Sequence, residues 1–161
     1  RLFLLSWKAR MILVFSVPNL NLMDKLELPT EQGWGASHQG STLWFSDGSS
    51  QLYFTDFEKG QPLRSINVTL RGEHINNLNE LEWVNNEIWA NLWQTDDIAQ
   101  IDPVSGNVLG IVHLNGILPK RDKMYNTNVL NGIARDPANG AIWITGKRWP
   151  WLYQIELESK F

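Results

Sequence analysis

The amino-acid sequence predicts an all-β protein with the architecture of a β-propeller. Short strand-like runs recur along its 161 residues, and clusters of turn-forming residues such as DGSS at 47–50 separate them. A unit of several such strands returns after roughly 40–50 residues, which is typical of propeller blades. Each blade is a small antiparallel sheet that cannot bury both of its faces alone, so successive blades must pack against one another.

The repeat is anchored by an apolar residue followed by tryptophan in the middle of a strand. This dipeptide occurs three times, at intervals of 45 and 54 residues, and a degenerate copy begins at Leu2, 41 residues before the first. The extra residues before the third copy fit an insertion at 118–129, which shows no strand-like alternation. The three dipeptides are Leu43-Trp44, Ile88-Trp89 and Ile142-Trp143.

A turn between two strands repeats with the same spacing. Asp56 and Gly60 flank it in one copy, and Asp102 and Gly106 flank it in the next, at an offset of 46 residues. A β-sandwich made of similar hairpins is the alternative fold. A sandwich has no reason to repeat a turn motif at a fixed interval, so the repeat favours the propeller.

The repeats divide the chain into a single, incomplete propeller domain. Three and a fraction copies are too few to close a ring, because propellers have at least about four blades. The chain also begins at Arg1, directly in strand-like sequence. We therefore expect an N-terminally truncated fragment of about three and a half blades. The approximate blades are 1–40, 41–86, 87–140 and 141–161.

Composition and charge exclude several classes of function. The 14 basic and 17 acidic residues are interspersed and give a net charge of -3, so we expect no nucleic-acid partner. The chain has no cysteine, and its three histidines show no metal-ligand spacing, so we expect no metal site. No stretch approaches the ~18 uninterrupted apolar residues of a membrane span. Neither a cofactor nor a membrane is an expected partner.

The composition is unusual for its nine tryptophans against three tyrosines. Trp44, Trp89 and Trp143 lie in mid-strand and are expected in the core. Trp34 differs because glycines flank it, and glycine lets a backbone approach other groups closely. Trp93 follows a strand among polar residues, which is a poor position for a core residue. These last two tryptophans are therefore candidates for a binding surface.

The binding residues of a propeller converge at one end of its central axis, where the ends of equivalent strands meet. We expect the innermost strands near Leu43–Ser46, Ile88–Asn91 and Ile142–Thr145. The residues that flank these strands should lie close together in space although they are far apart in the sequence. They are Trp34, Gly35, Asn79, Glu80, Asn91, Trp93, Asn131, Lys147 and Trp149.

Simpler interpretations remain open for the polar residues. Asn79 precedes a strand and can hold a local turn, and Lys147 can be a solvated surface lysine. Three aspartates are better explained as turn residues, whose side chains bind neighbouring backbone amides, than as catalytic groups. They are Asp47, Asp56 and Asp102.

Several segments of the chain are similar to the glutaminyl-peptide cyclotransferase family of plant and bacterial type. They are GWG at 33–35, SDGSSQLYFTD at 46–56, LNELEWVNNEIWANLWQTDDIAQIDPVSG at 78–106, VLNGIARD at 129–136 and TGKRWPWLYQIEL at 145–157. The resemblance covers essentially the whole chain. It implies a five-bladed β-propeller and a metal-independent acyltransferase, without a cofactor. The implied reaction converts the N-terminal glutamine of a peptide or protein into pyroglutamate with release of ammonia.

The resemblance also assigns roles to individual residues. Trp7 (in SWK), Trp34 and Trp93 correspond to tryptophans that bind the substrate, and Asn79 and Lys147 correspond to catalytic residues. The family's catalytic glutamate, in a GEG segment, and its glutamine, in FTQGL, correspond to positions before the start of this chain. We therefore expect the 161-residue chain by itself to be inactive. The full-length protein is expected to be a monomer that is periplasmic or secreted.

A glutamine substrate explains why tryptophan and carboxamide residues occur together. Its neutral side chain offers no charge for a salt bridge, so recognition needs hydrogen bonds from groups such as the Asn79 amide. Apolar walls such as Trp34 and Trp93 can hold the chain and exclude water. A non-catalytic propeller that binds peptides is the alternative. A sugar-binding propeller would also use tryptophan platforms, but it does not explain the pairing of asparagine with lysine.

Overall fold

The structure is a computed structural model that describes residues 1–56, 59 and 62–158. Its fold is all-β, as the sequence predicts: the described residues form strands, connecting turns and one short 3-10 helix, η1 (Lys120–Asp122). No helix in the described part of the chain is long and apolar enough to cross a membrane. Gly60, which flanks one of the predicted turns, lies outside the described residues.

Within the described residues, four antiparallel sheets of three or four strands follow one another along the chain. The first sheet contains β1 (Leu2–Leu5), β2 (Met11–Phe15) and β3 (Leu22–Glu27). The second contains β4 (Ala36–Gln39), β5 (Thr42–Ser46), β6 (Gln51–Asp56) and β7 (Arg64–Asn67). The third contains β10 (Leu78–Val84), β11 (Glu87–Leu92), β12 (Asp97–Ile101) and β13 (Val108–His113). The last contains β14 (Leu130–Arg135), β15 (Ile142–Gly146) and β16 (Tyr153–Ile155).

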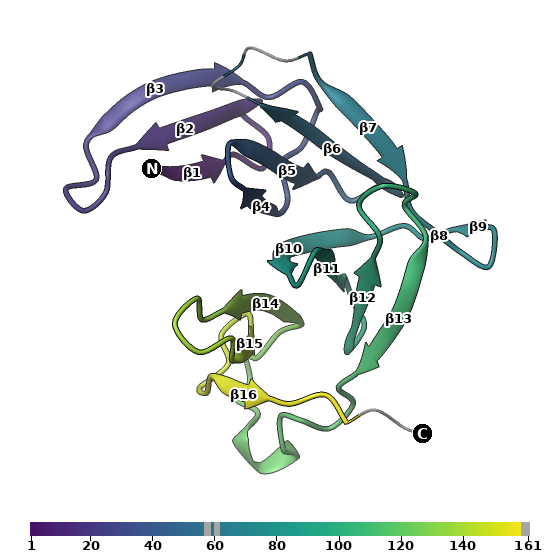
Figure 1. The fold of residues 1–161 in the computed structure, drawn as a ribbon. Helices are drawn as coiled ribbons and strands as arrows, with labels where there is room; N and C mark the ends of the chain where they lie inside the picture. The colour runs from purple at the N-terminus through teal and green to yellow at the C-terminus, as the bar shows by residue number, and fades with distance from the viewer. Residues whose placement is uncertain (57–58, 60–61, 159–161) are drawn as a thin grey trace.

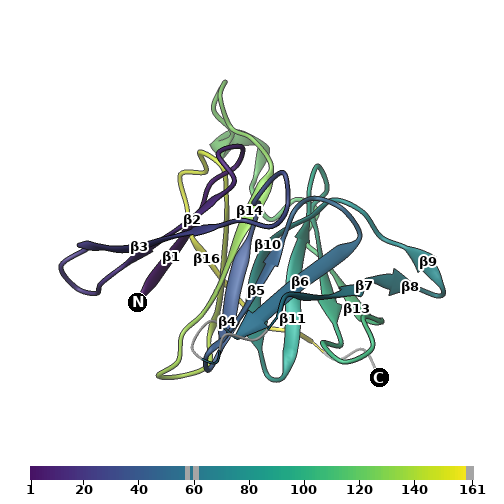
Figure 2. The same ribbon diagram turned by 90° about the horizontal axis from the view of Figure 1, so that it is seen from above.

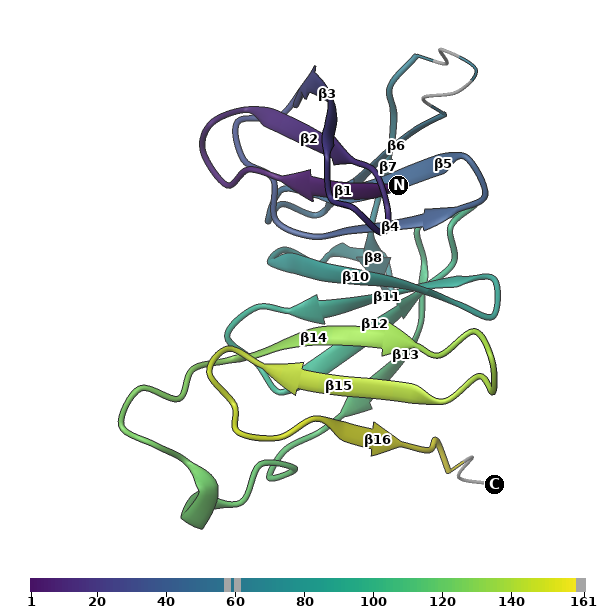
Figure 3. The ribbon, with the colours of Figure 1, turned by 90° about the vertical axis from the view of Figure 1, so that its left-hand side faces the viewer.

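The sheets are arranged like a fan around a common centre (Figure 1). From the side they lie one above the other in chain order, from β1–β3 to β14–β16 (Figure 3). Among the described residues, no strand of the first sheet pairs with a strand of the last, so the array is open. A two-stranded hairpin, β8 (Thr69–Leu70) and β9 (Glu73–His74), projects from its outer side (Figures 1 and 2).

The innermost strands are β4, β10 and β14, and the sequence-based choice of innermost strands was wrong. Neighbouring sheets meet through contacts of β10 with β4 and with β14. These three strands also lie nearest to the centre in Figure 1. The predicted segments Leu43–Ser46, Ile88–Asn91 and Ile142–Thr145 are strands, but each is the second strand of its sheet. The blade divisions derived from the repeat accordingly fall between the first and second strands of a sheet.

The second strand of each of the two central sheets is strongly apolar. Most side chains of β5 and β11 are buried. The innermost strands instead carry polar side chains that bind the next sheet. Glu82 of β10 accepts a hydrogen bond from the N–H of Arg135 in β14 at 2.8 Å, and Ser37 Oγ of β4 accepts one from the N–H of Trp83 at 2.9 Å. Hydrophobicity therefore marks the second strand in the sequence, not the strand nearest the centre.

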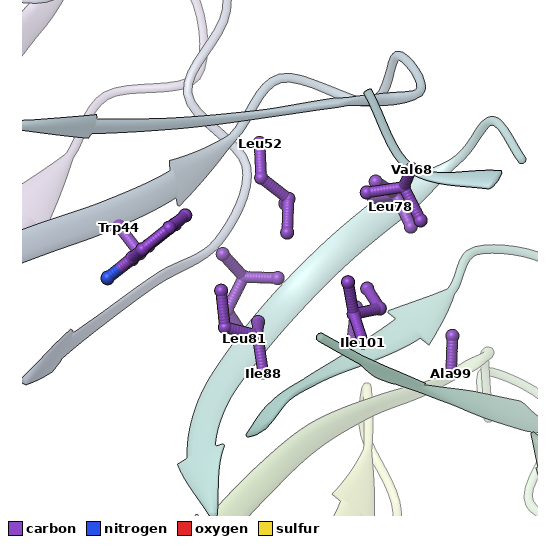
Figure 4. Packing of buried hydrophobic residues seen from close by; sticks show 9 residues of the cluster. Trp44, Leu52, Val68, Leu78, Leu81, Ile88, Ala99 and Ile101 are labelled. Atoms are coloured by element: carbon purple, nitrogen blue, oxygen red, sulfur yellow. The ribbon is translucent and has the colours of Figure 1, made fainter. Parts of the chain in front are cut away.

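A cluster of buried side chains lies between the two central sheets (Figure 4). Leu52 of the second sheet faces Leu81 of the third, and the ring of Trp44 lies beside them. Trp44 and Trp89 are buried, as the sequence predicts, whereas Trp143 is only partly buried. These apolar side chains lie between sheets, so packing between neighbours stabilises the fan.

Aspartate side chains hold the turns that follow strands, as the sequence predicts. Asp47 Oδ1 accepts a hydrogen bond from the N–H of Ser49 at 3.0 Å, and Asp102 Oδ1 accepts one from the N–H of Val104 at 3.1 Å. Asp56 Oδ1 accepts a backbone N–H bond of the following turn at 3.1 Å. These bonds satisfy backbone donors that have no strand partner.

Candidate functional site

One cavity brings together all five residues that the sequence analysis assigned to the site. It has a volume of about 400 Å³ and lies where β1, β11 and β15 end and where β4, β10 and β14 begin. The expected convergence on a shared cavity is therefore confirmed, while the chemical role of each residue stays a prediction. The lining residues are Trp7, Trp34, Asn79, Trp93, Asn131 and Lys147.

Three of the lining residues lie at matching positions of successive sheets. Trp34 precedes β4, Asn79 is the second residue of β10, and Asn131 is the second residue of β14. In β10 and β14 the pairing with the neighbouring strand shifts its register around the asparagine, as in a β-bulge. A bulge bends the strand and redirects its side chains. Here it accompanies the placement of both carboxamides at the cavity.

Trp93 and Lys147 occupy the matching position on the neighbouring strand of their sheets. The N–H of Trp93 donates to Asn77 O, and the N–H of Lys147 donates to Val129 O, both at 2.9 Å. Each acceptor lies two residues before the cavity asparagine of its sheet. The same hairpin geometry therefore delivers two side chains to the cavity from each of the last two sheets.

Gln32 joins two of the cavity tryptophans. Its Oε1 accepts a hydrogen bond from Nε1 of Trp7 at 2.7 Å and another from Nε1 of Trp34 at 3.0 Å. The Trp7 side chain is 60% exposed, so packing alone would leave its ring free to rotate. Lys8 Nζ lies 4.2 Å from the centre of the Trp7 ring, in cation–π geometry. These contacts hold Trp7 at the mouth of the cavity.

Trp34 packs edge-on against Trp93. Their ring centroids are 5.4 Å apart and their planes differ by 78°, which is an arrangement that aromatic pairs prefer. Gly48 makes room for the Trp34 ring, because a Cβ at position 48 would lie 2.6 Å from Trp34 Cζ2. The φ angle of Gly48, 88°, also lies in the region that favours glycine. Trp34 and Trp93 thus form an apolar wall of fixed geometry, and Gln32 connects Trp7 to it.

The backbone fixes Trp34 relative to Asn79. Ser46 is fully buried, and its Oγ accepts the N–H of Gly35 at 3.0 Å and donates to Asn79 O at 2.7 Å. A Cβ on Gly35 would overlap the backbone of Asn79. Glycine is therefore required for the start of β4 to lie against β10.

The polar side chains of the cavity have unused hydrogen-bonding capacity. Within the described part of the chain, the side chains of Asn79, Asn131 and Lys147 make no hydrogen bond and no ion pair. Asn79 is only 5% exposed, so the surrounding protein shields its amide from bulk water. The described residues contain no group of three His, Asp or Glu that could hold a metal ion.

Glu80, next to Asn79, supports the site without lining it. Its Oε2 accepts the N–H of Ile133 in β14 at 2.8 Å. Burial raises the pKa of Glu80 well above its usual range, and the nearby charge of Glu82 raises it further. The hydrogen bond from Ile133 lowers this pKa, but by less. Glu80 thus connects the third sheet to the strand that carries Asn131.

Two other residues that flank the strands have structural roles. Trp149 covers Gly146, and its Nε1 donates to Asn128 O at 2.8 Å. Asn91 is fully buried, and its Oδ1 accepts the N–H of Gly132 at 2.8 Å. Neither residue is among those that line the cavity.

Comparison with known proteins identifies the family. A model of the glutamine cyclotransferase family matches residues 1–157. The chain belongs to the glutamine cyclotransferase family. A glutaminyl-peptide cyclotransferase of Arabidopsis thaliana is 38% identical over 163 residues, which are 99% of this chain and 50% of that protein. The chain spans about half the length of this curated relative.

One solved structure supports the same family, and a second shares only the fold. The crystal structure of Myxococcus xanthus glutaminyl cyclase matches with a TM-score of 0.87 and 32% identity, over 97% of this chain and 68% of that one. A streptogramin B lyase structure matches with a TM-score of 0.57 and 14% identity, over 91% of this chain and 45% of that one. The second match is a likeness of fold alone.

Two residues of the site carry only weak signals in the sequence. Asn131 is one of nine flanking residues, although the dipeptide Leu130-Asn131 repeats Leu78-Asn79. Gln32 stands before the Gly-Trp-Gly segment, but its partner Trp7 lies 25 residues away. The repeat could have indicated Asn131, whereas the bridge made by Gln32 depends on the fold.

Proposed function

We propose that the whole protein to which this chain belongs is a glutaminyl-peptide cyclotransferase, which forms pyroglutamate from the N-terminal glutamine of a peptide or protein. The observation that carries this proposal is the lining of the cavity: three indoles, two carboxamides and one lysine, in a chain of this family. The cavity volume of about 400 Å³ suits one amino-acid side chain with its α-amino group.

The apolar wall would bind the substrate. Trp7, Trp34 and Trp93 can hold the methylene groups of glutamine and exclude water from the reacting atoms. A glutamine held in a folded conformation has its α-amine close to its own γ-carbonyl carbon. Such proximity lowers the barrier of an intramolecular reaction by several kcal/mol in favourable cases.

The polar wall would act on the reaction itself. The α-amine nitrogen attacks the γ-carbonyl carbon and forms a tetrahedral intermediate whose oxygen carries a negative charge. Asn79 and Lys147 are the proposed catalytic residues, which donate hydrogen bonds to this oxygen. The positive charge of Lys147 would also favour the neutral, nucleophilic form of the amine.

Ammonia leaves in the second half of the reaction. A proton moves from the α-nitrogen to the γ-carboxamide nitrogen, the bond from that nitrogen to the attacked carbonyl carbon breaks, and the carbonyl of the lactam reforms. A carboxyl group suits this proton transfer, and we propose that the glutamate of the family's GEG segment, expected before Arg1, provides it. Proton transfer and hydrogen bonding account for every step, so the proposed mechanism is metal-independent.

The architecture we propose for the whole protein is a five-bladed β-propeller, of which this chain forms about three and a half blades. The sequential sheets around one centre support it. The chain covers 68% of the Myxococcus xanthus structure, which is close to three and a half parts in five.

Ammonia release from a peptide with N-terminal glutamine, measured with the purified whole protein, tests the proposal. We expect release of ammonia, formation of pyroglutamate by mass spectrometry, and the same rate in excess chelator. The same peptide with an acetylated α-amine is the control and should not react. Binding of the free peptide without turnover would instead indicate the non-catalytic, peptide-binding propeller.

A further inference from the structure

We propose that Asn131 is a further catalytic residue, whose Nδ2 amide donates a hydrogen bond to the γ-carbonyl oxygen of the substrate glutamine as this oxygen becomes negatively charged. The inference rests on the proposed cyclotransferase function. The family resemblance assigns a single asparagine, Asn79, to the site, so Asn131 adds a second carboxamide to the polar wall.

The orientation of the Asn131 amide determines which of its atoms meets a ligand. Its Oδ1 is buried and has no hydrogen-bond partner among the described residues. Asn131 nevertheless lines the cavity. Its Nδ2 also makes no hydrogen bond within the described chain, but unlike Oδ1 it is accessible. The amide nitrogen is therefore the polar atom that Asn131 presents to the cavity.

Asn131 and Lys147 reach the cavity from adjacent strands. The N–H of Lys147 donates to Val129 O at 2.9 Å, and the N–H of Asn128 donates to Lys147 O at 3.0 Å. These bonds hold the end of β15 against the start of β14. The two side chains of this hairpin that line the cavity are consequently neighbours on the same side of the cavity.

Both of these side chains offer only donors to a ligand. An ammonium group has three N–H donors and no acceptor, and the nitrogen of a primary amide has two donors. Two donor groups in one cavity are complementary to an acceptor such as a carbonyl oxygen. In the reacting part of a glutamine, the γ-carbonyl oxygen is the acceptor, and it gains negative charge in the tetrahedral intermediate.

Buried side chains of the neighbouring sheet fix the backbone that follows Asn131. Asn91 Oδ1 accepts the N–H of Gly132, and Glu80 Oε2 accepts the N–H of Ile133, both at 2.8 Å. Asn91 is fully buried, so it cannot move easily. A donor held in place before the reaction stabilises a developing oxyanion without further reorganisation, which is the arrangement that electrostatic catalysis needs.

Substitutions in the whole protein test this role through kcat and KM for a peptide with N-terminal glutamine. Asn131→Ala should lower kcat about 100-fold and change KM less than about threefold, the effect of removing one oxyanion donor. Asn131→Asp has nearly the same shape, but it replaces the donor with an oxygen that repels the oxyanion. It should therefore lower kcat more than Asn131→Ala.

A matched control lies on the same hairpin. Asn139 is exposed in the turn between β14 and β15, and its Oδ1 accepts the N–H of Ala141 at 2.9 Å. Asn139→Asp introduces the same charge and keeps an acceptor for this bond, so kcat should stay at the wild-type value. Circular dichroism and the Tm of each variant show whether it is folded.

The possible outcomes separate this inference from the proposed function. Wild-type kcat in folded Asn131→Asp would overturn the role of Nδ2 as a donor to the oxyanion. A loss confined to KM would also overturn it, because it would indicate contact with a group that does not change during the reaction. A wild-type protein that forms no pyroglutamate would overturn the proposed function, and this inference with it.

Discussion

The two walls of the cavity differ in how their polar atoms are used. On the apolar wall, the indole N–H groups of Trp7 and Trp34 are both bound by Gln32. On the polar wall, the side chains of Asn79, Asn131 and Lys147 have no partner within the described part of the chain. The protein itself binds two of the three indole N–H groups on one wall and leaves the hydrogen-bonding groups of the other for a ligand.

This difference separates shape from chemistry. Indoles that are fixed by hydrogen bonds and by edge-on packing provide a preformed surface, which binds the substrate and the transition state alike. Polar groups without a protein partner lose their hydrogen bonds to water when a ligand covers them. They form their strongest bonds to the ligand when negative charge develops on it, as in the transition state. Substitutions on the two walls should therefore change different kinetic constants.

Loss of the cation on the polar wall should have the largest effect. Lys147→Ala in the whole protein is expected to lower kcat for a glutamine peptide by about 100-fold or more, with a small change in KM. Lys123 is exposed near η1, and Lys123→Ala serves as the control for loss of a positive charge. Steady-state kinetics measures both constants. A change of KM alone in Lys147→Ala would remove the distinction between the walls.

Truncation of the apolar wall should affect binding instead. Trp93→Ala removes the ring that packs on Trp34 and is expected to raise KM about tenfold, while kcat falls much less. Trp93→Phe keeps an aromatic surface, so its KM should lie between those of the wild type and Trp93→Ala. Trp151 is 56% exposed and does not line the cavity, so Trp151→Ala is the control for loss of an indole. Equal losses of kcat and kcat/KM would place Trp93 with the polar wall.

A smaller effect is expected at the bridge between the two indoles. Gln32→Met has a similar shape but removes the acceptor for Trp7 and Trp34, and we expect it to raise KM about threefold. Gln32→Glu keeps an oxygen acceptor and should bind the substrate like the wild type. The KM values of the two variants decide this. If both variants weaken binding equally, the hydrogen bonds of Gln32 do not hold the wall.

The smallest effect on catalysis, with a measurable effect on stability, is expected at Glu80. Since its pKa is raised in the folded protein, the folded state holds the proton more tightly than the unfolded chain. Stability should therefore fall as the pH rises from the usual pKa of glutamate, about 4.3, through the raised value.

Glu80→Gln removes this titration and keeps an acceptor for the N–H of Ile133. We expect its Tm near pH 8 to exceed that of the wild type by about 2–4 °C, and the difference to vanish at low pH. Thermal unfolding followed by circular dichroism at a series of pH values measures this. Parallel Tm–pH curves for the two proteins would show that Glu80 does not titrate in a buried site.

Only part of the site could be predicted from the sequence. Trp34, with its flanking glycines, and Trp93, beyond a strand end, stand out because their surroundings do not suit a core. Asn79 and Lys147 are recognised through the segments around them, and the repeat places all four at strand ends. The orientation of the Asn131 amide has no such signal, because it depends on a bulge and on the neighbouring sheet.

The sequence by itself determined the strand content, the repeat and the residues that surround the cavity. Alternation of apolar and polar residues and turn-forming segments are local properties, so they can be read along one chain. The tertiary structure alone decided that β4, β10 and β14 are innermost, because these strands bind the next sheet through polar side chains that give no hydrophobic signal. It also decided which polar atoms stay unpaired, since a hydrogen bond such as that from Trp7 to Gln32 depends on distances between distant segments.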